Sequence, residues 1–348
     1  MGVWFGTSLP ADYGNFEEEY GRASRLVALV DTNFQLVAEL TGQDRVRYLN
    51  AVTSGNIRDL ASGQSAPGLL LNPQGHILAE LRTLGLGDRL TFLSHALERD
   101  RTLATLDKFI IMDDVTLQDR TDEFSTMALV GPEASAVVRK IAGINLSDLS
   151  HGGHAETSLT TPAGATPIAC RVLEGTSLGL GGAEFLIDRA RTQELWRALV
   201  PAAERHGGGV AGYRAIEALR LEAGVPWFGA DFDDRMIPHE AGLEQSHISY
   251  VKGCYTGQEI VERVRSRGQV NRRRVGLAFS GDSLPPPGAK LKAEGKEAGW
   301  VTSAAFSPRA SRGIGMGYLR REFIAPGARL DWDLGEAQVI ELPLKQSP

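Results

Sequence analysis

The segment Lys252-Gly253-Cys254-Tyr255-Thr256-Gly257-Gln258-Glu259 places one of the chain's two cysteines in a turn that is broken by glycine. Thr256 and Glu259 have the spacing of a capping box, in which each side chain accepts a hydrogen bond from a free amide at a helix start. Apolar residues then recur at helical spacing, at Ile260, Val261 and Val264. The stretch therefore predicts a helix that begins just after Thr256.

Cys254 is the candidate reactive group of this segment. The free amides of the expected helix start and the ammonium of Lys252 would both favour its thiolate over its thiol. The alternative is that Cys254 is a small buried hydrophobe, which is a common fate of free cysteines. A flanking lysine and two glycines favour the reactive interpretation, because packing alone requires neither.

Bulk properties describe an ordinary soluble protein. A chain of 348 residues is longer than one core usually supports, so we expect two or three domains. A net charge of −6 argues against general binding of nucleic acid. Two cysteines form no disulfide framework, and neither a signal sequence nor a membrane-spanning run is visible. We expect a protein of the reducing cytoplasm, with no membrane association.

Mixed strand and helix patterns fill the first three quarters of the chain. Leu69–Leu78 reads as a hairpin whose turn contains proline and glycine, and 192–205 and 213–222 read as helices. From Val275 onward, short strands alternate with glycine and proline, which is typical of a small antiparallel barrel. The expected fold class is α+β rather than a doubly wound parallel sheet.

Two polar motifs are candidate binding sites, one for an anion and one for a metal ion. Six arginines lie between positions 263 and 274, and they indicate either an anion-docking site or a set of structural ion pairs. The pair His151 and His154 lacks further cysteine or carboxylate ligands nearby, so we expect no metal there.

The whole signature KGCYTGQE resembles that of the YgfZ family of folate-binding proteins. The segment from Arg220 to Gly224, with Pro238 and Glu240 after it, resembles both that family and the related glycine cleavage T-protein, an aminomethyltransferase. Gly299–Ser303 and Met316–Tyr318 look like parts of the T-protein's C-terminal barrel. The resemblance implies a three-domain, clover-like arrangement. Its expected domains are a folate-binding lobe at 1–145, a second α+β lobe at 146–267 and a β-barrel at 268–348.

What the resemblance implies for function is a tetrahydrofolate-binding protein that supports assembly or repair of iron-sulfur enzymes. Cys254 would be its reactive thiol and Lys252 would assist it. The expected partners are folate, iron-sulfur apoenzymes and cluster assembly proteins. The expected folate contacts are Glu80, Ser94, Arg220, Glu222, Tyr255 and Gln258.

Two other functions remain open. One is aminomethyl transfer, in which Glu80 would replace the catalytic aspartate of the T-protein. Ala79, Leu186 and Ile216 stand where the T-protein has an aspartate, a folate-binding glutamate and an arginine, which argues against this activity. The other is a binding or scaffold protein that holds folate without turnover.

Overall fold

The computed structural model describes residues 1–159, 166–281 and 283–345. Its chain divides into two compact units. Unit 1 comprises Met1–Leu70, Ala79–Ile216 and Ser249–Tyr255, and unit 2 comprises Leu71–Leu78, Glu217–Ile248 and Thr256–Pro348. Cys254 thus belongs to unit 1, whereas the helix that follows it belongs to unit 2. The expected division at residues 145 and 267 stays a prediction.

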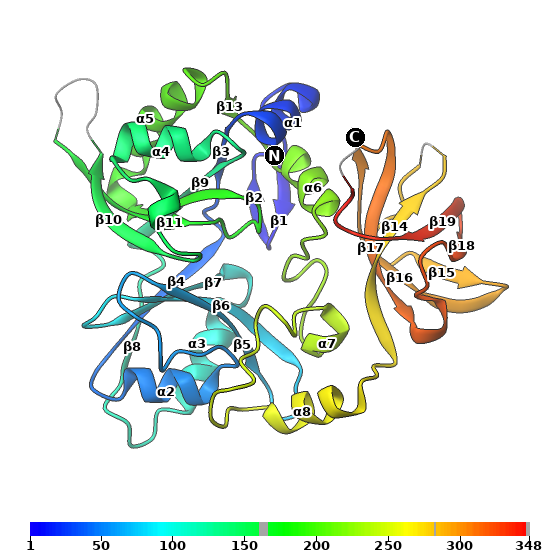
Figure 1. The fold of residues 1–348 in the computed structure, drawn as a ribbon, viewed down its shortest axis with the longest axis horizontal. Coiled ribbons are helices and arrows are strands. Elements are labelled where there is room, and N and C mark those ends of the chain that lie inside the picture. The colour runs from blue at the N-terminus through cyan, green and yellow to red at the C-terminus, as the bar shows by residue number, and fades with distance from the viewer. Residues whose placement is uncertain (160–165, 282, 346–348) are drawn as a thin grey trace. The chain divides into compact units, whose positions relative to one another are not determined.

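A six-stranded sheet forms one half of unit 1, in the order β10-β11-β12-β9-β3-β13 (Figure 1). Its strands are β3 (Ala28–Asp31), β9 (Phe124–Val130), β10 (His154–Leu159), β11 (Ile168–Glu174), β12 (Gly182–Asp188) and β13 (Gly209–Val210). Neighbouring strands pair antiparallel except β3 and β13, which are parallel.

Two helices cover one face of this sheet, α4 (Ala134–Ala142) and α5 (Thr192–Glu204). Every second residue of β12 lies in the core shared with these helices, namely Ala183, Phe185 and Ile187. Because side chains alternate along a strand, Glu184 and Leu186 lie on the opposite face of β12. Leu186 accordingly belongs to a second core, which includes Val37 and Leu93 of the other sheet.

The second sheet has five strands in the order β5-β6-β7-β4-β8. They are β4 (Gln35–Thr41), β5 (Ser65–Leu71), β6 (Ile77–Gly85), β7 (Leu90–His95) and β8 (Thr116–Asp119). The expected hairpin is confirmed: β5 and β6 are neighbours, and the Asn72 amide donates to the His76 carbonyl in their turn. By contrast, β3 and β4 are consecutive in the chain but join different sheets.

Shorter elements complete unit 1. They are β1 (Gly2–Trp4), β2 (Thr7–Leu9), α1 (Phe16–Arg25), α2 (Arg45–Val52), α3 (Arg99–Lys108) and the 3-10 turns η1 (Ala96–Glu98), η2 (Leu146–Asp148) and η3 (Arg189–Arg191). The Asn15 side chain caps α1 by accepting from the amides of Glu17 and Glu18. Buried Glu19 accepts from the amides of Tyr13 and Gly212, so α1 is held to the segment before α6.

Unit 2 ends in the expected antiparallel barrel, which is closed in the order β14-β17-β16-β15-β18-β19. Its strands are β14 (Arg272–Phe279), β15 (Lys290–Ala293), β16 (Lys296–Ser307), β17 (Arg312–Arg320), β18 (Arg329–Trp332) and β19 (Gly335–Ile340), with the 3-10 turn η4 (Arg321–Phe323). Leu277, Phe279, Val301 and Leu319 are among the residues that fill it. The α+β fold class with a C-terminal barrel is therefore confirmed.

Three helices precede the barrel. They are α6 (Tyr213–Glu222), α7 (Pro238–Ala241) and α8 (Gln258–Arg267). The boundary between the units falls inside α6, after Ile216. Within unit 2, α8 begins against the turn between β5 and β6: a Cβ on Gly257 would lie 2.7 Å from the Asn72 oxygen. One on Gly75 would lie 2.9 Å from Ile260 Cβ.

Candidate functional site

In the turn before α8 the residue Cys254 is exposed, whereas Cys170 is buried. The interpretation of Cys254 as a buried hydrophobe is therefore wrong, and it describes Cys170 instead. The predicted capping box is also wrong. Gly257, not Thr256, is the N-cap of α8, with φ +83° and no side-chain cap bond. The Glu259 carboxylate pairs forward with Arg263, 2.5 Å away.

Lys252 is anchored two residues before the sulfur. Its Nζ donates to the main-chain oxygens of Asn50, Thr53 and Gly55 at 2.5, 2.6 and 2.7 Å, and the residue is only 7% exposed. These carbonyls lie at and just beyond the end of α2, where helix oxygens have no intrahelical partner and cations are favoured. The lysine therefore holds the cysteine-bearing turn to α2.

The surroundings of Lys252 also lower its pKa, and an aromatic ring lies near its ammonium group. Burial, and then the nearby Arg58, lower the pKa of Lys252 from 10.5 to about 8. The Tyr255 ring centre lies 5.2 Å from Nζ, within the range of a cation–π contact. Tyr255 is itself buried, at 7% exposure. The structure thus brings Lys252, Cys254 and Tyr255 together in one turn, and their roles in catalysis and folate binding stay predictions.

Glu80 on β6 faces a histidine on the neighbouring strand. Its Oε2 lies 3.2 Å from Nε2 of His95 on β7, and the Glu80 side chain is 29% exposed. Ser94 Oγ donates to the Glu80 main-chain oxygen at 2.7 Å. His95 was not among the residues predicted from the sequence, although it directly follows Ser94. A carboxylate paired with imidazole can hold a proton and pass it on.

A second carboxylate, that of Glu184 on β12, is completely buried. It accepts from Gln35 Nε2 at 2.6 Å and from Ser177 Oγ at 2.7 Å. Arg82 lies 4.0 Å away, and burial lowers the pKa of Arg82. From the sequence we expected Glu184 to face away from Leu186, and this expectation is wrong. Its position two residues before Leu186 places both on one face of β12, and that spacing was the available signal.

Three other expected folate contacts, Arg220, Glu222 and Gln258, belong to unit 2. Arg220 is 0% exposed; its guanidinium pairs with Asp231 and lies 4.5 Å from the Trp227 ring centre. Glu222 is 1% exposed and accepts from Ser307 Oγ at 2.6 Å. Folate would have to displace these partners to reach either charge. Gln258 is half-buried as the first residue of α8.

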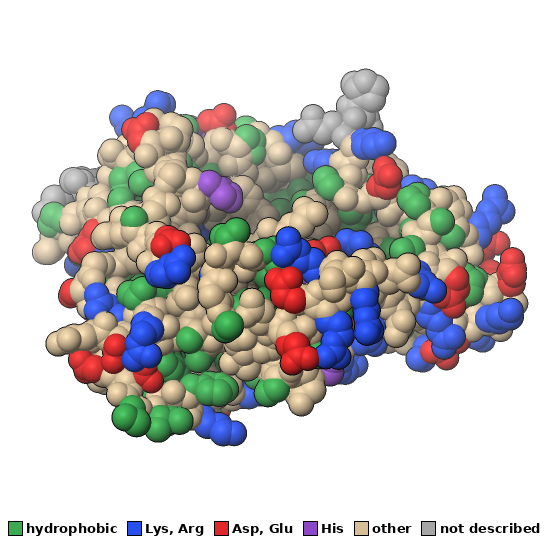
Figure 2. All heavy atoms as spheres, turned by 60° about the horizontal axis from the view of Figure 1, so that its bottom comes forward, with side chains coloured by type: hydrophobic (Ala, Val, Ile, Leu, Met, Phe, Trp, Pro, Cys, Tyr) green, Lys and Arg blue, Asp and Glu red, His purple; other side chains and the backbone are tan. Residues whose placement is uncertain are grey.

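Most of the arginines between positions 263 and 274 have acidic partners. The pairs are Arg263–Glu259, Arg265–Glu262, Arg272–Glu240 and Arg273–Glu244. Arg274 donates to the Ala241 carbonyl at 2.8 Å, and burial lowers the pKa of this arginine. On the face seen in Figure 2, basic side chains are interspersed with acidic ones. These contacts favour structural ion pairs over an anion-docking site.

His154 has a fixed tautomer. Arg171 Nη1 lies 3.0 Å from its Nδ1, and its Nε2 lies 3.1 Å from the Gln64 carbonyl. The guanidinium can only donate and the carbonyl can only accept, so the ring is neutral with its proton on Nε2. Within residues 1–159, 166–281 and 283–345, no group of three histidine, cysteine or acidic residues is placed to hold a metal.

Two family models match the chain. That of the GCVT N-terminal domain covers residues 1–247, and that of the glycine cleavage T-protein C-terminal barrel domain covers residues 272–345. The chain belongs to the glycine cleavage T-protein family. In the described part of the chain, no helix is long and apolar enough to cross a membrane.

Full-length members of the T-protein family resemble this chain throughout. The aminomethyltransferase of Rippkaea orientalis is 28% identical over 358 residues, which cover 99% of this chain and 93% of that protein. The mitochondrial aminomethyltransferase of Gallus gallus is 30% identical over 348 residues, with 99% and 85% covered. The crystal structure of aminomethyltransferase T from Bartonella henselae matches with a TM-score of 0.86 at 23% identity, covering 99% and 94%. This last match shows the T-protein fold.

Three positions where the T-protein was expected to carry charge are apolar and buried here. Ala79 is 1% exposed, Leu186 is 6% exposed and Ile216 is 0% exposed. Leu186 packs in the core that also holds Val37 and Leu93. None of the three side chains can form the charged contact expected of the T-protein residue at its position.

Proposed function

We propose that this member of the T-protein family binds tetrahydrofolate and acts through Cys254 to support assembly or repair of iron-sulfur enzymes. The observation that carries the proposal is that Cys254 is an exposed residue in a turn that Lys252 anchors. The apolar character of Ala79, Leu186 and Ile216 supports it, because aminomethyl transfer would lack those charged contacts.

In unit 1, two polar groups are the proposed folate contacts. The Glu80 carboxylate is partly exposed, and carboxylates accept hydrogen bonds from N–H groups such as those of a pterin. In this proposal Glu80 and Ser94 hold the ligand, with Tyr255 as a further candidate contact. The roles of Gln258, Arg220 and Glu222, which belong to unit 2, stay predictions. Folate supplies a one-carbon carrier. An exposed thiolate can act as a nucleophile toward such a unit, form a mixed disulfide or ligate iron.

The first test measures binding and thiol reactivity together. Purified protein is titrated with tetrahydrofolate by calorimetry, and the alkylation rate of Cys254 is measured with and without ligand. We expect saturable binding that changes the alkylation rate. Absence of binding would remove folate from the proposal. Binding with no effect at Cys254 would favour a folate-holding scaffold without turnover.

The second test asks whether the sulfur is needed in cells. A strain in which the gene for this protein is deleted is complemented with the wild type, Cys254→Ala or Cys170→Ala. The activity of an iron-sulfur enzyme is then measured in each strain. We expect Cys254→Ala to abolish support and the buried control, Cys170→Ala, to retain it at matched protein levels. Full support by Cys254→Ala would eliminate the proposed role of the sulfur.

Aminomethyl transfer is the second candidate, and the relatives named aminomethyltransferase favour it together with the Glu80–His95 pair. In this candidate, Glu80 holds or moves the proton at the reacting nitrogen of folate. The assay supplies an aminomethylated lipoyl carrier protein and tetrahydrofolate, and it follows methylene-tetrahydrofolate. Turnover that is lost in Glu80→Gln and kept in Cys254→Ala would replace the first proposal with this one.

A further inference from the structure

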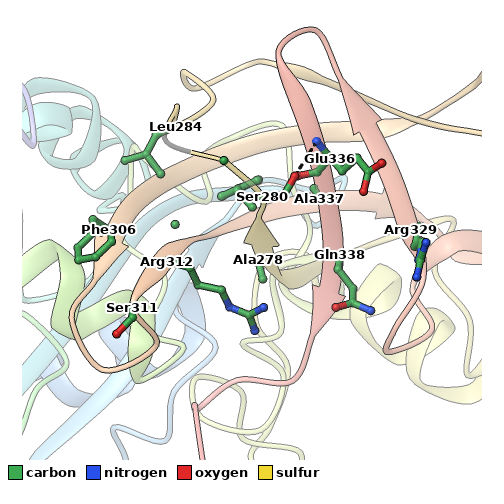
Figure 3. A pocket seen from close by; sticks show the side chains of 13 residues that line it. Ala278, Ser280, Leu284, Phe306, Ser311, Arg312, Arg329, Glu336, Ala337 and Gln338 are labelled. Carbon is green, nitrogen blue, oxygen red and sulfur yellow. Dashed lines mark hydrogen bonds between the residues drawn. The ribbon is translucent and has the colours of Figure 1, made fainter.

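The outer face of the barrel in unit 2 carries a groove that the proposed function does not use. The groove has a volume of about 620 Å³ and is lined by residues of β14, β16, β17, β18 and β19 and of the loops beside them (Figure 3). Leu277 and Phe279 of β14 point into the barrel core. Ala278 and Ser280, which alternate with them, therefore point outward and form part of the groove floor.

Two arginines line the groove, Arg312 on β17 and Arg329 on β18. Neither has an acidic partner in the described part of the chain. Both are exposed. Strands β14 and β19 lie between β17 and β18. Arg312 and Arg329 therefore lie on strands that are not neighbours in the barrel.

Apolar side chains lie at the Arg312 end of the groove. Leu284 and Phe306 are 40% and 51% exposed, and Figure 3 shows them on the side of Arg312, away from Arg329. Exposed apolar residues beside a groove are a common feature of protein–protein contact sites. An occupant that covers them gains apolar burial at one end only.

Glu336 adds a negative charge to the groove and so affects where an occupant can carry acidic groups. It lines the groove, and its main chain exchanges hydrogen bonds of 3.2 Å with Ser280 Oγ. Glu336 follows Ser280 across the sheet, so it lies between the strands that carry the two arginines. Its carboxylate disfavours an acidic group in the middle of an occupant, while each guanidinium favours a carboxylate at an end.

We propose that this groove binds an extended acidic segment of a partner protein. One apolar side chain of the segment covers Leu284 and Phe306, and two carboxylates of the segment pair with Arg312 and Arg329. The charge pattern of the groove selects a peptide with acidic ends and a neutral middle.

The test uses the full chain and a fluorescein-labelled, end-blocked peptide made of phenylalanine, glutamate, three serines and a second glutamate. Fluorescence anisotropy measures binding to the wild type, Arg312→Glu, Arg329→Glu and Lys290→Glu. Lys290 is a matched control, because it is exposed on β15 and pairs with Glu297 outside the groove. We expect about tenfold weaker binding for each arginine variant and an unchanged affinity for Lys290→Glu.

The salt dependence of binding and a second peptide test whether charge drives the binding. We expect affinity to fall between low salt and about 1 M salt, where the screening length shrinks to about 3 Å. A peptide with lysines in place of both glutamates should not bind. No saturable binding, or an equal loss in Lys290→Glu, would overturn the proposal. So would a wild-type dimer in sedimentation that Phe306→Ser abolishes, because the groove would then be covered by a second copy. None of these measurements involves folate or Cys254.

Discussion

Lys252 Nζ donates a hydrogen bond of 2.6 Å to the main-chain oxygen of Thr53, a residue 199 positions earlier in the chain. The same ammonium also bonds the oxygens of Asn50 and Gly55. A lysine that was expected to act on Cys254 through its charge therefore also fixes the backbone that carries Cys254. Holding the turn in place and carrying a charge near Cys254 are separate roles of Lys252. Different substitutions test them.

Replacement of the anchor, Lys252→Met, is expected to lower the free energy of unfolding by about 2 to 4 kcal/mol. Hydrogen bonds to charged groups contribute about 1.5 to 3 kcal/mol each, they are not additive, and three carbonyls lose their partner. We also expect slower alkylation of Cys254, because this residue is already exposed and loses the ammonium that was expected to favour its thiolate. Urea unfolding and alkylation kinetics measure the two effects.

The neighbouring Arg58→Met serves as the control for charge. Its guanidinium lowers the pKa of Lys252 but is not one of the anchor contacts. We expect the pKa of Lys252 to rise in this variant, with a stability change within about 0.5 kcal/mol, since the site is exposed. Equal destabilisation by both substitutions would contradict the anchoring role.

The buried Arg220–Asp231 pair predicts a larger effect. Both side chains have no exposed surface, and Asp231 also accepts from Thr302 Oγ and Ser303 Oγ. Asp231→Ala removes the fully buried partner and leaves the guanidinium with only the partly exposed Glu217, which costs about 3 to 5 kcal/mol. Denaturation measured by a tryptophan signal tests this. Glu217→Ala removes only the partly exposed partner of Arg220 and should cost less than about 1 kcal/mol.

Local patterns predicted much of the fold, because they depend on neighbours in sequence. The helix expected at 213–222 is α6, the hairpin around Pro73 and Gly75 forms, and the barrel begins at Arg272. The sheet partners of β3 and β4 could not be predicted. A turn at Asp31-Thr32-Asn33 reverses or redirects the chain, but it does not say which strand each flank will join.

The candidate site was predicted less completely, for a related reason. Cys254 stood out because its turn has an unusual local composition. The anchoring of Lys252 joins segments about 200 residues apart, and nothing in the local sequence encodes that distance. The helix begins at Gln258, close to the predicted start, but the capping box is wrong because Gly257, with its left-handed backbone, occupies the N-cap position expected for Thr256.

His154 predicts a loss of stability on mild acidification. Burial, and then the nearby Arg171, lower the pKa of His154 from 6.5 to about 4 in the folded chain. Between these values the unfolded chain binds a proton that the folded chain does not, so this contribution is complete above pH 6.5 and falls toward pH 4. Unfolding free energies of the wild type and His154→Gln, measured from pH 7 to pH 4.5, should converge or cross. An imidazole that titrates near 6.5 by NMR would contradict this prediction.

The two glycines that flank Cys254 should respond differently to alanine. Gly257 has φ +83°, and a Cβ there would lie 2.7 Å from the Asn72 main-chain oxygen, which cannot rotate away. Gly257→Ala is therefore expected to cost about 1 to 3 kcal/mol and to speed amide exchange in the first turn of α8. Gly253 is the matched control, because a Cβ there meets nothing within 4 Å. Gly253→Ala should change stability by less than about 0.5 kcal/mol. Equal effects from both substitutions in urea unfolding and hydrogen exchange would show that the contact with Asn72 does not position α8.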